Sequence, residues 1–195
     1  MKPISILALP QALASSIAIP MEMISAADTI FRLRNRQRSN TVALHVVAEE
    51  IDNMIVSGGM GIKPSTRLAD TPVSELIFVP ALWGNPRAAV AQHSEAVAWL
   101  ANQYAAGATI CSVGSGSYFL GAAGLLDGKS ATTHWRYFDD FETQFPNAKL
   151  QRKRFITHQD RLYCTGSVNA VRDVMLHFVE QLFDGSTADE VARHF

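Results

Sequence analysis

The residues best suited to chemistry surround a turn of small residues, Gly114-Ser115-Gly116, and a histidine downstream of it, His134. The turn follows a short apolar run and precedes a segment with helical spacing. A sharp turn between a strand and a helix exposes a nucleophile or a ligand contact at the carboxyl end of a parallel sheet. A histidine can serve there as a general base when a nucleophile lies beside it. The backbone N–H groups of the turn could also hold an anion, and a plain tight turn is the simpler alternative.

The elements that position this turn follow from the apolar pattern. Apolar runs predict strands over residues 4–9, 41–47, 76–79 and 108–113, a strand pair at 155–158 and 162–164, and a small antiparallel hairpin over 54–62 that turns at Gly58 to Gly61. Helical spacing predicts helices over 21–33 (opened by Pro20), 94–104, 117–126, from Thr132-Thr133 to 141, after Thr165-Gly166-Ser167, and over 188–195. Residues 11–19 and 80–86 are predicted as loops. Strands that alternate with helices indicate a mostly parallel sheet covered on both faces.

The composition fits a single domain. The chain has 195 residues, which is enough to bury a core without cross-links, and a net charge of −1. No apolar run is long enough to span a membrane, and the charge argues against DNA binding by this chain alone. Cys111 and Cys164 both lie in apolar, strand-like runs, which predicts reduced, buried thiols and a cytoplasmic location.

Two further groups of residues, the histidines and a run of arginines, have side chains that bind ligands in other proteins. The six histidines show none of the spacings of metal-binding motifs, so we expect no metal and no cofactor. Arginines at every second position from Arg32 to Arg38 could form a phosphate-binding strip, or a solvated loop after a helix, and the second interpretation is the usual one for such charges.

Two strings after the turn carry a resemblance to a known family. They are Ala-Gly-Leu-Leu-Asp-Gly at 123–128 and Ala-Thr-Thr-His-Trp at 131–135, supported by Ile-Pro-Met-Glu-Met at 19–23. The chain resembles the ThiJ/PfpI-type, class I glutamine amidotransferase-like domain, in particular the version at the N-terminus of AraC-type transcriptional regulators. The resemblance covers residues 1–195 as one domain and implies a flavodoxin-like three-layer α/β/α sandwich. It also implies a small-molecule effector, a homodimer, and DNA contact only through a helix-turn-helix domain downstream of this chain.

The resemblance also places the family's nucleophile in the turn. Catalytically active family members have a cysteine ten positions before the glycine of Ala-Gly-Leu-Leu. The same count back from Gly124 gives Gly114 in this chain. Cys111 lies three residues earlier in the predicted strand, roughly 10 Å of chain away, and cannot replace it. Active relatives also tend to have an acid in the loop before the first helix, but residues 12–19 include no carboxylate. We therefore predict no catalytic residue, with Ser115 as the alternative nucleophile.

The predicted ligand-binding residues come from the turn and from two segments that should face it. They are Gly114, Ser115, Gly116, His134, Ala81, Leu82, Trp83 and Gly84. The last four occupy the loop that is usually glycine-rich in the family, and the bulky pair Leu82-Trp83 is expected to narrow or fill a pocket there.

Three functional interpretations follow. The leading one is a ligand-sensing and dimerising domain of an AraC-type regulator, catalytically inactive because the nucleophile position is Gly114. The second is a hydrolase, amidase or hydratase of the ThiJ/PfpI superfamily that works without the thiol. The third is a structural dimerisation module with a filled pocket. The size of the cavity beside Trp83 separates the third interpretation from the first.

Overall fold

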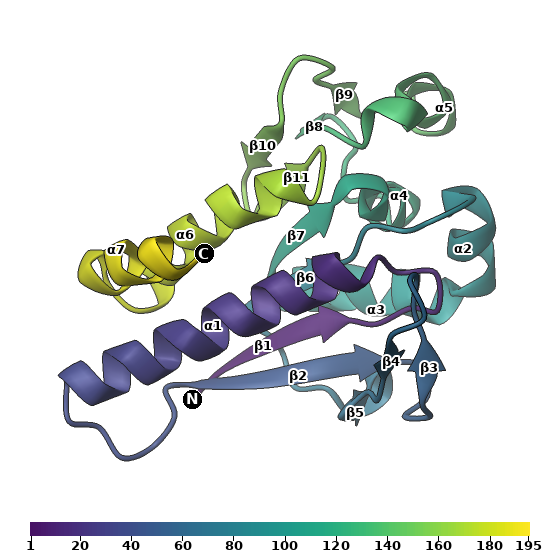
Figure 1. Cartoon of the computed structure of the whole chain (residues 1–195). Helices are drawn as coiled ribbons and strands as arrows, with labels where there is room; N and C mark the ends of the chain where they lie inside the picture. The colour runs from purple at the N-terminus through teal and green to yellow at the C-terminus, as the bar shows by residue number, and fades with distance from the viewer.

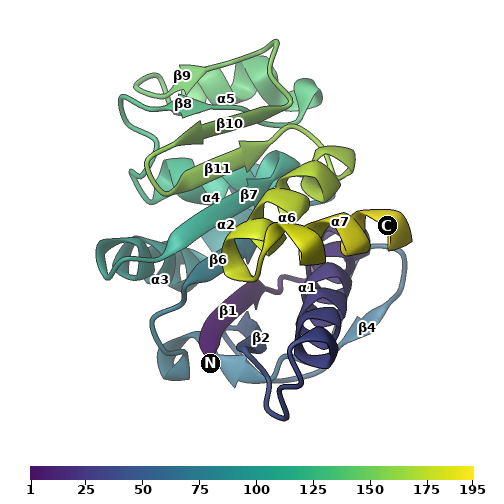
Figure 2. The same cartoon turned by 90° about the vertical axis from the view of Figure 1, so that its left-hand side faces the viewer.

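A seven-stranded sheet runs through the middle of the molecule in the order β10-β11-β7-β6-β1-β2-β5 (Figures 1 and 2). The computed structural model describes the whole chain, residues 1–195. The strands of this sheet are β1 (Lys2–Leu7), β2 (Val42–Ala48), β5 (Thr66–Arg67), β6 (Leu76–Val79), β7 (Thr109–Val113), β10 (Ile156–Gln159) and β11 (Leu162–Thr165). All neighbours are parallel except β10, which is antiparallel to β11. The predicted strands and the pairing of the last two are therefore confirmed.

Two smaller strand pairs lie outside this sheet. Strands β3 (Met54–Ile55) and β4 (Gly61–Ile62) form the predicted antiparallel hairpin. Strands β8 (Ser130–Ala131) and β9 (Lys149–Leu150) form a short parallel pair that the sequence pattern does not reveal.

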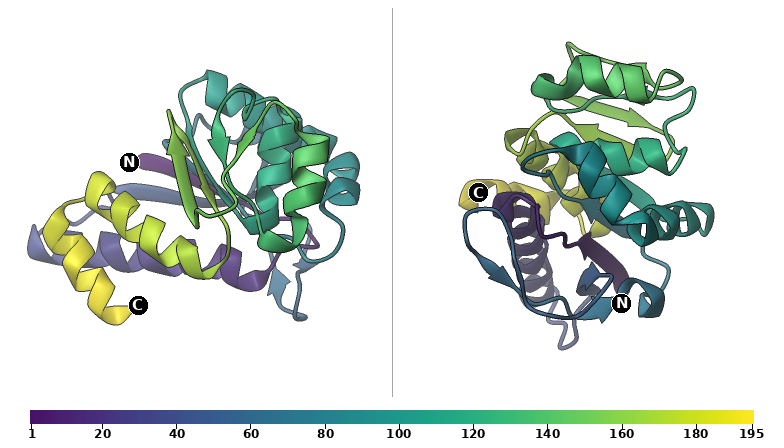
Figure 3. Two further views of the ribbon diagram at one scale, coloured as in Figure 1. Left: turned by 90° about the horizontal axis from the view of Figure 1, so that it is seen from above. Right: turned by 90° about the vertical axis from the view of Figure 1, so that its right-hand side faces the viewer.

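Helices cover both faces of the sheet, which confirms the predicted three-layer α/β/α sandwich. On one face α1 (Ala14–Arg34), α6 (Asn169–Leu182) and α7 (Gly185–His194) pack against one another. On the other lie α2 (Pro86–Gln92), α3 (Ser94–Ala105) and α4 (Ser117–Ala122). Figure 3 shows the two groups on opposite sides of the strands, with α5 (Phe138–Gln144) beside the β10 end of the sheet.

The central strands are apolar because both of their faces are covered. All four residues of β6 are buried, as are the last four of β7. This double burial explains why these strands have unbroken apolar sequences rather than an alternating pattern. Cys111 and Cys164 are free thiols in neighbouring strands, and both are buried, as predicted.

The first helix begins earlier than predicted. The predicted loop over 11–19 is wrong from Ala14 onward, and Pro20 lies inside α1 rather than at its start. A proline inside a helix removes one backbone hydrogen bond. Here Ile17 and Pro20 are both buried, and burial of this apolar face offsets that loss. The Ser16 hydroxyl also donates to the Leu13 carbonyl (2.6 Å) and ties down the first turn.

Other helix boundaries also differ from the predictions. Helix α4 ends at Ala122 rather than at 126, and Gly124 continues in a left-handed conformation (φ +69°). No helix starts at Thr132-Thr133, because both hydroxyls bind carbonyls of other segments and the chain stays extended until a 3-10 turn at Trp135–Tyr137. Helix α2 is not predicted: its first residue, Pro86, ends the predicted loop over 80–86, and no element is predicted for the rest of it.

Two arginines of the strip, Arg32 and Arg34, lie in the last turn of α1 and take part in ion pairs remote from the predicted site. Arg32 pairs with Asp28 (2.9 Å) in the same helix, and Arg34 pairs with Asp184 (2.5 Å) at the start of α7. Arg32 therefore stabilises its own helix, whereas Arg34 holds the end of α1 against the start of α7.

None of the helices is both long and apolar enough to cross a membrane.

Candidate functional site

An open cleft of about 900 Å³ lies where β1, β6 and β7 reach their carboxyl ends. The chain extends the sheet on one side of β1 to form β2 and then returns to the other side to form β6. Loops that leave such a reversal diverge, and ligands of open α/β sheets bind in the resulting crevice. The lining comes from Leu13, residues 81–87, Gly114, Ser115, residues 134–137, Asp140 and residues 167–169. Its volume lies in the range of small-molecule sites.

Seven of the eight predicted ligand-binding residues line this cleft, and Gly116 does not. A Cβ atom on Gly116 would lie 2.5 Å from the Pro80 carbonyl oxygen and 2.8 Å from that of Val79. Gly116 therefore allows the turn to pack against the end of β6, behind the cleft wall.

The turn keeps the geometry of a nucleophile elbow at Gly114. Its φ is +49°, and a Cβ atom there would meet only Ala81 Cβ at 3.5 Å and His134 Cβ at 3.7 Å. Both are ordinary van der Waals distances, so a side chain at this position would project toward His134. The Thr133 hydroxyl donates to the Gly114 carbonyl (3.2 Å) and fixes the turn beside the histidine.

Ser115 is not placed as a nucleophile. Its hydroxyl accepts a hydrogen bond from the Leu82 N–H (2.8 Å) and donates to the Leu82 carbonyl (3.0 Å). The residue is buried. Both polar groups of Leu82 are thus satisfied by one side chain, and Ser115 holds the loop after β6 against the turn.

His134 is half-buried beside the elbow. Its Nδ1 accepts from the Arg136 N–H (3.4 Å), which assigns the ring proton to Nε2. Burial lowers the pKa of His134, and the positive charge of Arg136 lowers it further. The ring is therefore neutral at pH 7 and could act as a base, but Gly114 gives it no nucleophile to activate.

Leu82 and Trp83, which are expected to narrow or fill the pocket, line it without filling it. Leu82 is 4% exposed and packs into the core, whereas Trp83 is 70% exposed and lies along the cleft wall. Trp135, which is 72% exposed, also lines the cleft. The cleft is open, which removes the interpretation as a module with a filled pocket.

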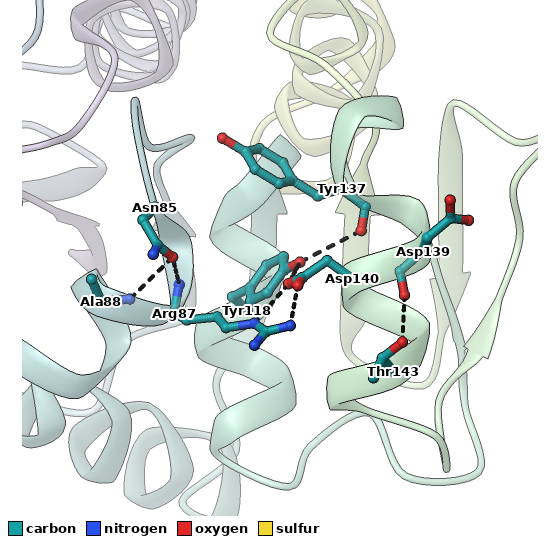
Figure 4. A network of polar contacts seen from close by, with 8 residues as sticks. All are labelled: Asn85, Arg87, Ala88, Tyr118, Tyr137, Asp139, Asp140 and Thr143. Atoms are coloured by element: carbon teal, nitrogen blue, oxygen red, sulfur yellow. Dashed lines mark hydrogen bonds and ion pairs between the residues drawn. The ribbon is translucent and has the colours of Figure 1, made fainter.

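A polar network on one wall was not predicted from the sequence (Figure 4). Arg87 Nε donates to Asp140 Oδ2 (3.0 Å), and a second guanidinium nitrogen contacts Oδ1. Tyr118 donates its hydroxyl to Asp140 Oδ2 (2.6 Å). Hydrogen bonds from Arg87 and Tyr118 lower the pKa of Asp140, and burial together with Asp140 raises the pKa of Tyr118. The network joins helices α2, α4 and α5.

The start of helix α2 places Arg87 in this network. Asn85 caps the helix, because its side-chain oxygen accepts from the N–H groups of Arg87 (3.0 Å) and Ala88 (3.4 Å). Pro86 occupies the first turn, where its missing N–H has no cost. The Asn-Pro pair was the available sequence signal for this helix. Tyr137 donates its hydroxyl to the Gly84 carbonyl (2.6 Å) and closes the same wall.

No group of three or more His, Cys, Asp or Glu side chains is arranged to hold a metal ion.

Comparison with known proteins agrees with this geometry. The profile of the DJ-1/PfpI family matches residues 16–181. The HTH-type transcriptional regulator CdhR of Pseudomonas aeruginosa is 28% identical over 90% of this chain and 51% of its own length. An isonitrile hydratase of Pseudomonas putida is 32% identical over 77% of this chain and 64% of its own length. The chain thus spans about half the length of this regulator and about two thirds of the hydratase.

A solved structure shows the same fold. An AraC family transcriptional regulator from Pseudomonas putida superposes with a TM-score of 0.80 at 17% identity, over 99% of this chain and 98% of that one. The sequence relatives include both transcriptional regulators and an enzyme. With a family profile that matches most of its length, the chain belongs to the DJ-1/PfpI family.

Proposed function

We propose that this chain is the effector-binding and dimerisation domain of an AraC-type transcriptional regulator and that it has no catalytic activity. The observation that carries the proposal is the nucleophile position of the turn, which is Gly114, so that no nucleophilic atom faces His134. The hydroxyl of the neighbouring Ser115 is engaged in hydrogen bonds with both the N–H and the carbonyl of Leu82. The cleft nevertheless remains open at about 900 Å³, which suits binding without chemistry.

The regulator relatives support the wider part of the proposal. A small-molecule effector would occupy the cleft and shift the population of the domain between two states. DNA contact would be made by a separate helix-turn-helix domain, and the protein would act in the cytoplasm as a homodimer.

Ligand-dependent stabilisation tests the proposal. Thermal unfolding of the chain should be followed against a panel of metabolites, with size-exclusion chromatography and light scattering to give its mass. At 100 times its dissociation constant an effector stabilises by about 2.7 kcal/mol, which raises the Tm of a chain of this size by roughly 5–10 °C. His134→Ala in the cleft should reduce the shift, whereas His45→Ala, outside it, should not. A monomeric chain that no metabolite stabilises would contradict the proposal.

The second candidate function is an enzyme of the same family, and the identity to an isonitrile hydratase is the observation that favours it. Water would then add to a substrate held in the cleft, with His134 as the base. Incubation with a simple isonitrile, followed by chromatography, tests this candidate. Turnover that is lost in His134→Ala would support it, and absence of turnover in the wild type would remove it.

A further inference from the structure

The charges that line the cleft do not balance. Two arginines, Arg87 and Arg136, and one carboxylate, Asp140, line it. Asp140 accepts from the Arg87 guanidinium and from the Tyr118 hydroxyl. Its charge is therefore already neutralised by Arg87, and its oxygens are occupied before any ligand arrives.

Arg136 has no such partner. Its guanidinium makes no ion pair and no side-chain hydrogen bond, although it lines the cleft one residue after Trp135. Its positive charge adds to burial in lowering the pKa of His134, the ring beside the elbow. The net charge of the lining at neutral pH is thus one positive, and it is located at Arg136.

The aromatic side chains of the rim supply apolar surface around this charge. Trp83 and Trp135 are 70% and 72% exposed, and both line the cleft. The ring centroid of Trp135 lies 5.5 Å from that of His134. Large apolar side chains left open to water at a concave site mark a surface that a ligand covers.

We propose that the cleft binds a small organic carboxylate, with Arg136 as its counter-ion and with Trp83 and Trp135 covering its apolar body. This inference rests on the proposed function and names the chemical class of the effector. A guanidinium matches a carboxylate with two parallel hydrogen bonds, and it is the side chain best suited to that role. A cationic ligand would find no free carboxylate in the cleft, because Asp140 is already paired.

Three probes of similar shape test the charge requirement: phenylacetate, phenylacetamide and phenethylamine. Their dissociation constants should be measured by tryptophan fluorescence and by NMR titration of the chain. The acid should bind about tenfold more tightly than the amide, and the amine most weakly, since a charge-assisted hydrogen bond contributes more than a neutral one. The bound acid should also raise the pKa of His134, because a nearby negative charge favours the protonated ring.

Two arginine variants supply the matched comparison. Arg136→Gln should abolish the preference for the acid over the amide, and Arg136→Lys should restore part of that preference. Arg38→Gln removes an exposed arginine outside the cleft lining and should change nothing.

The outcomes separate this inference from the proposed function. Amide or amine binding as tight as that of the acid, or an acid preference that survives in Arg136→Gln, overturns the inference while the cleft remains a ligand site. The absence of saturable binding of all three probes up to about 10 mM overturns it too. A metabolite that stabilises the chain in the thermal screen would, in that case, still support the proposed function.

Discussion

Alanine should destabilise the protein more at Gly116 than at Gly114, although only Gly114 has a strained backbone conformation. Gly114 is left-handed (φ +49°), but a Cβ atom there has no contact shorter than 3.5 Å. Gly114→Ala should therefore cost only the conformational penalty, about 1 kcal/mol, or 2–4 °C in Tm for a chain of this size. Gly116 has an ordinary helical backbone (φ −59°), but its Cβ would lie 2.5 Å from a backbone oxygen. Gly116→Ala should cost about 3 kcal/mol, at the upper end for overpacking.

Urea denaturation followed by circular dichroism measures both costs. The midpoint of Gly116→Ala should fall about three times as far as that of Gly114→Ala, with unchanged slopes of free energy against urea. A changed slope would mean that the variant alters the compactness of one state rather than its stability. If Gly114→Ala were the more damaging variant, or if Gly116→Ala were neutral, the described geometry of the turn would be wrong.

Three shorter predictions concern the same region. Gly114→Cys should introduce a single thiol that iodoacetamide labels at pH 7, because this thiol faces His134. The two native thiols are buried and have raised pKa values, so they should not react, and equal labelling of the wild type would contradict this prediction. Ser115→Ala should lower stability by about 1–3 kcal/mol in urea, since both polar groups of Leu82 lose their partner; an unchanged midpoint would refute that role. The folded state lowers the pKa of Asp140 from 3.8, so its contribution is present at neutral pH and is lost as pH falls through the lowered value. The urea midpoint of Asp140→Asn should therefore lie below that of the wild type at pH 7 and approach it in acid, and a constant gap would contradict this assignment.

Much of the fold was predictable because the central strands are buried on both faces. A strand such as β6 has four apolar residues in a row, which leaves few alternatives. Boundaries were harder, since they depend on contacts that local sequence does not contain. Pro20 indicates a helix start, yet burial of Ile17 extends α1 back to Ala14. The sequence predicts a helix from Thr132-Thr133, but the hydroxyls of these threonines bind Arg154 and Gly114, far away in the sequence.

The cleft, too, was predictable from the sequence only in part. A family string predicted His134 and the elbow, and seven of the eight predicted residues line the cleft. Asp140 was missed because its partner, Arg87, lies 53 residues away, and only the packing of α2 beside α5 brings them together. Gly116 was grouped with its neighbours in the turn, although only the folded chain shows that it faces β6 rather than the cleft.

The last residue of the chain lies beside the beginning of helix α6. Arg172, in the first turn of α6, donates from Nε to the Phe195 carbonyl (2.6 Å) and from a terminal nitrogen to the Ala192 carbonyl (3.3 Å). Residues 167–169, just before it, line the cleft. Any polypeptide fused after Phe195 would therefore begin at a contact with Arg172, which lies about one helical turn, roughly 5 Å along α6, from the residues of the cleft wall. A displacement of the cleft wall at residues 167–169 would thus be transmitted to such a segment by Arg172 alone, and no element on the other face of the sheet would have to move.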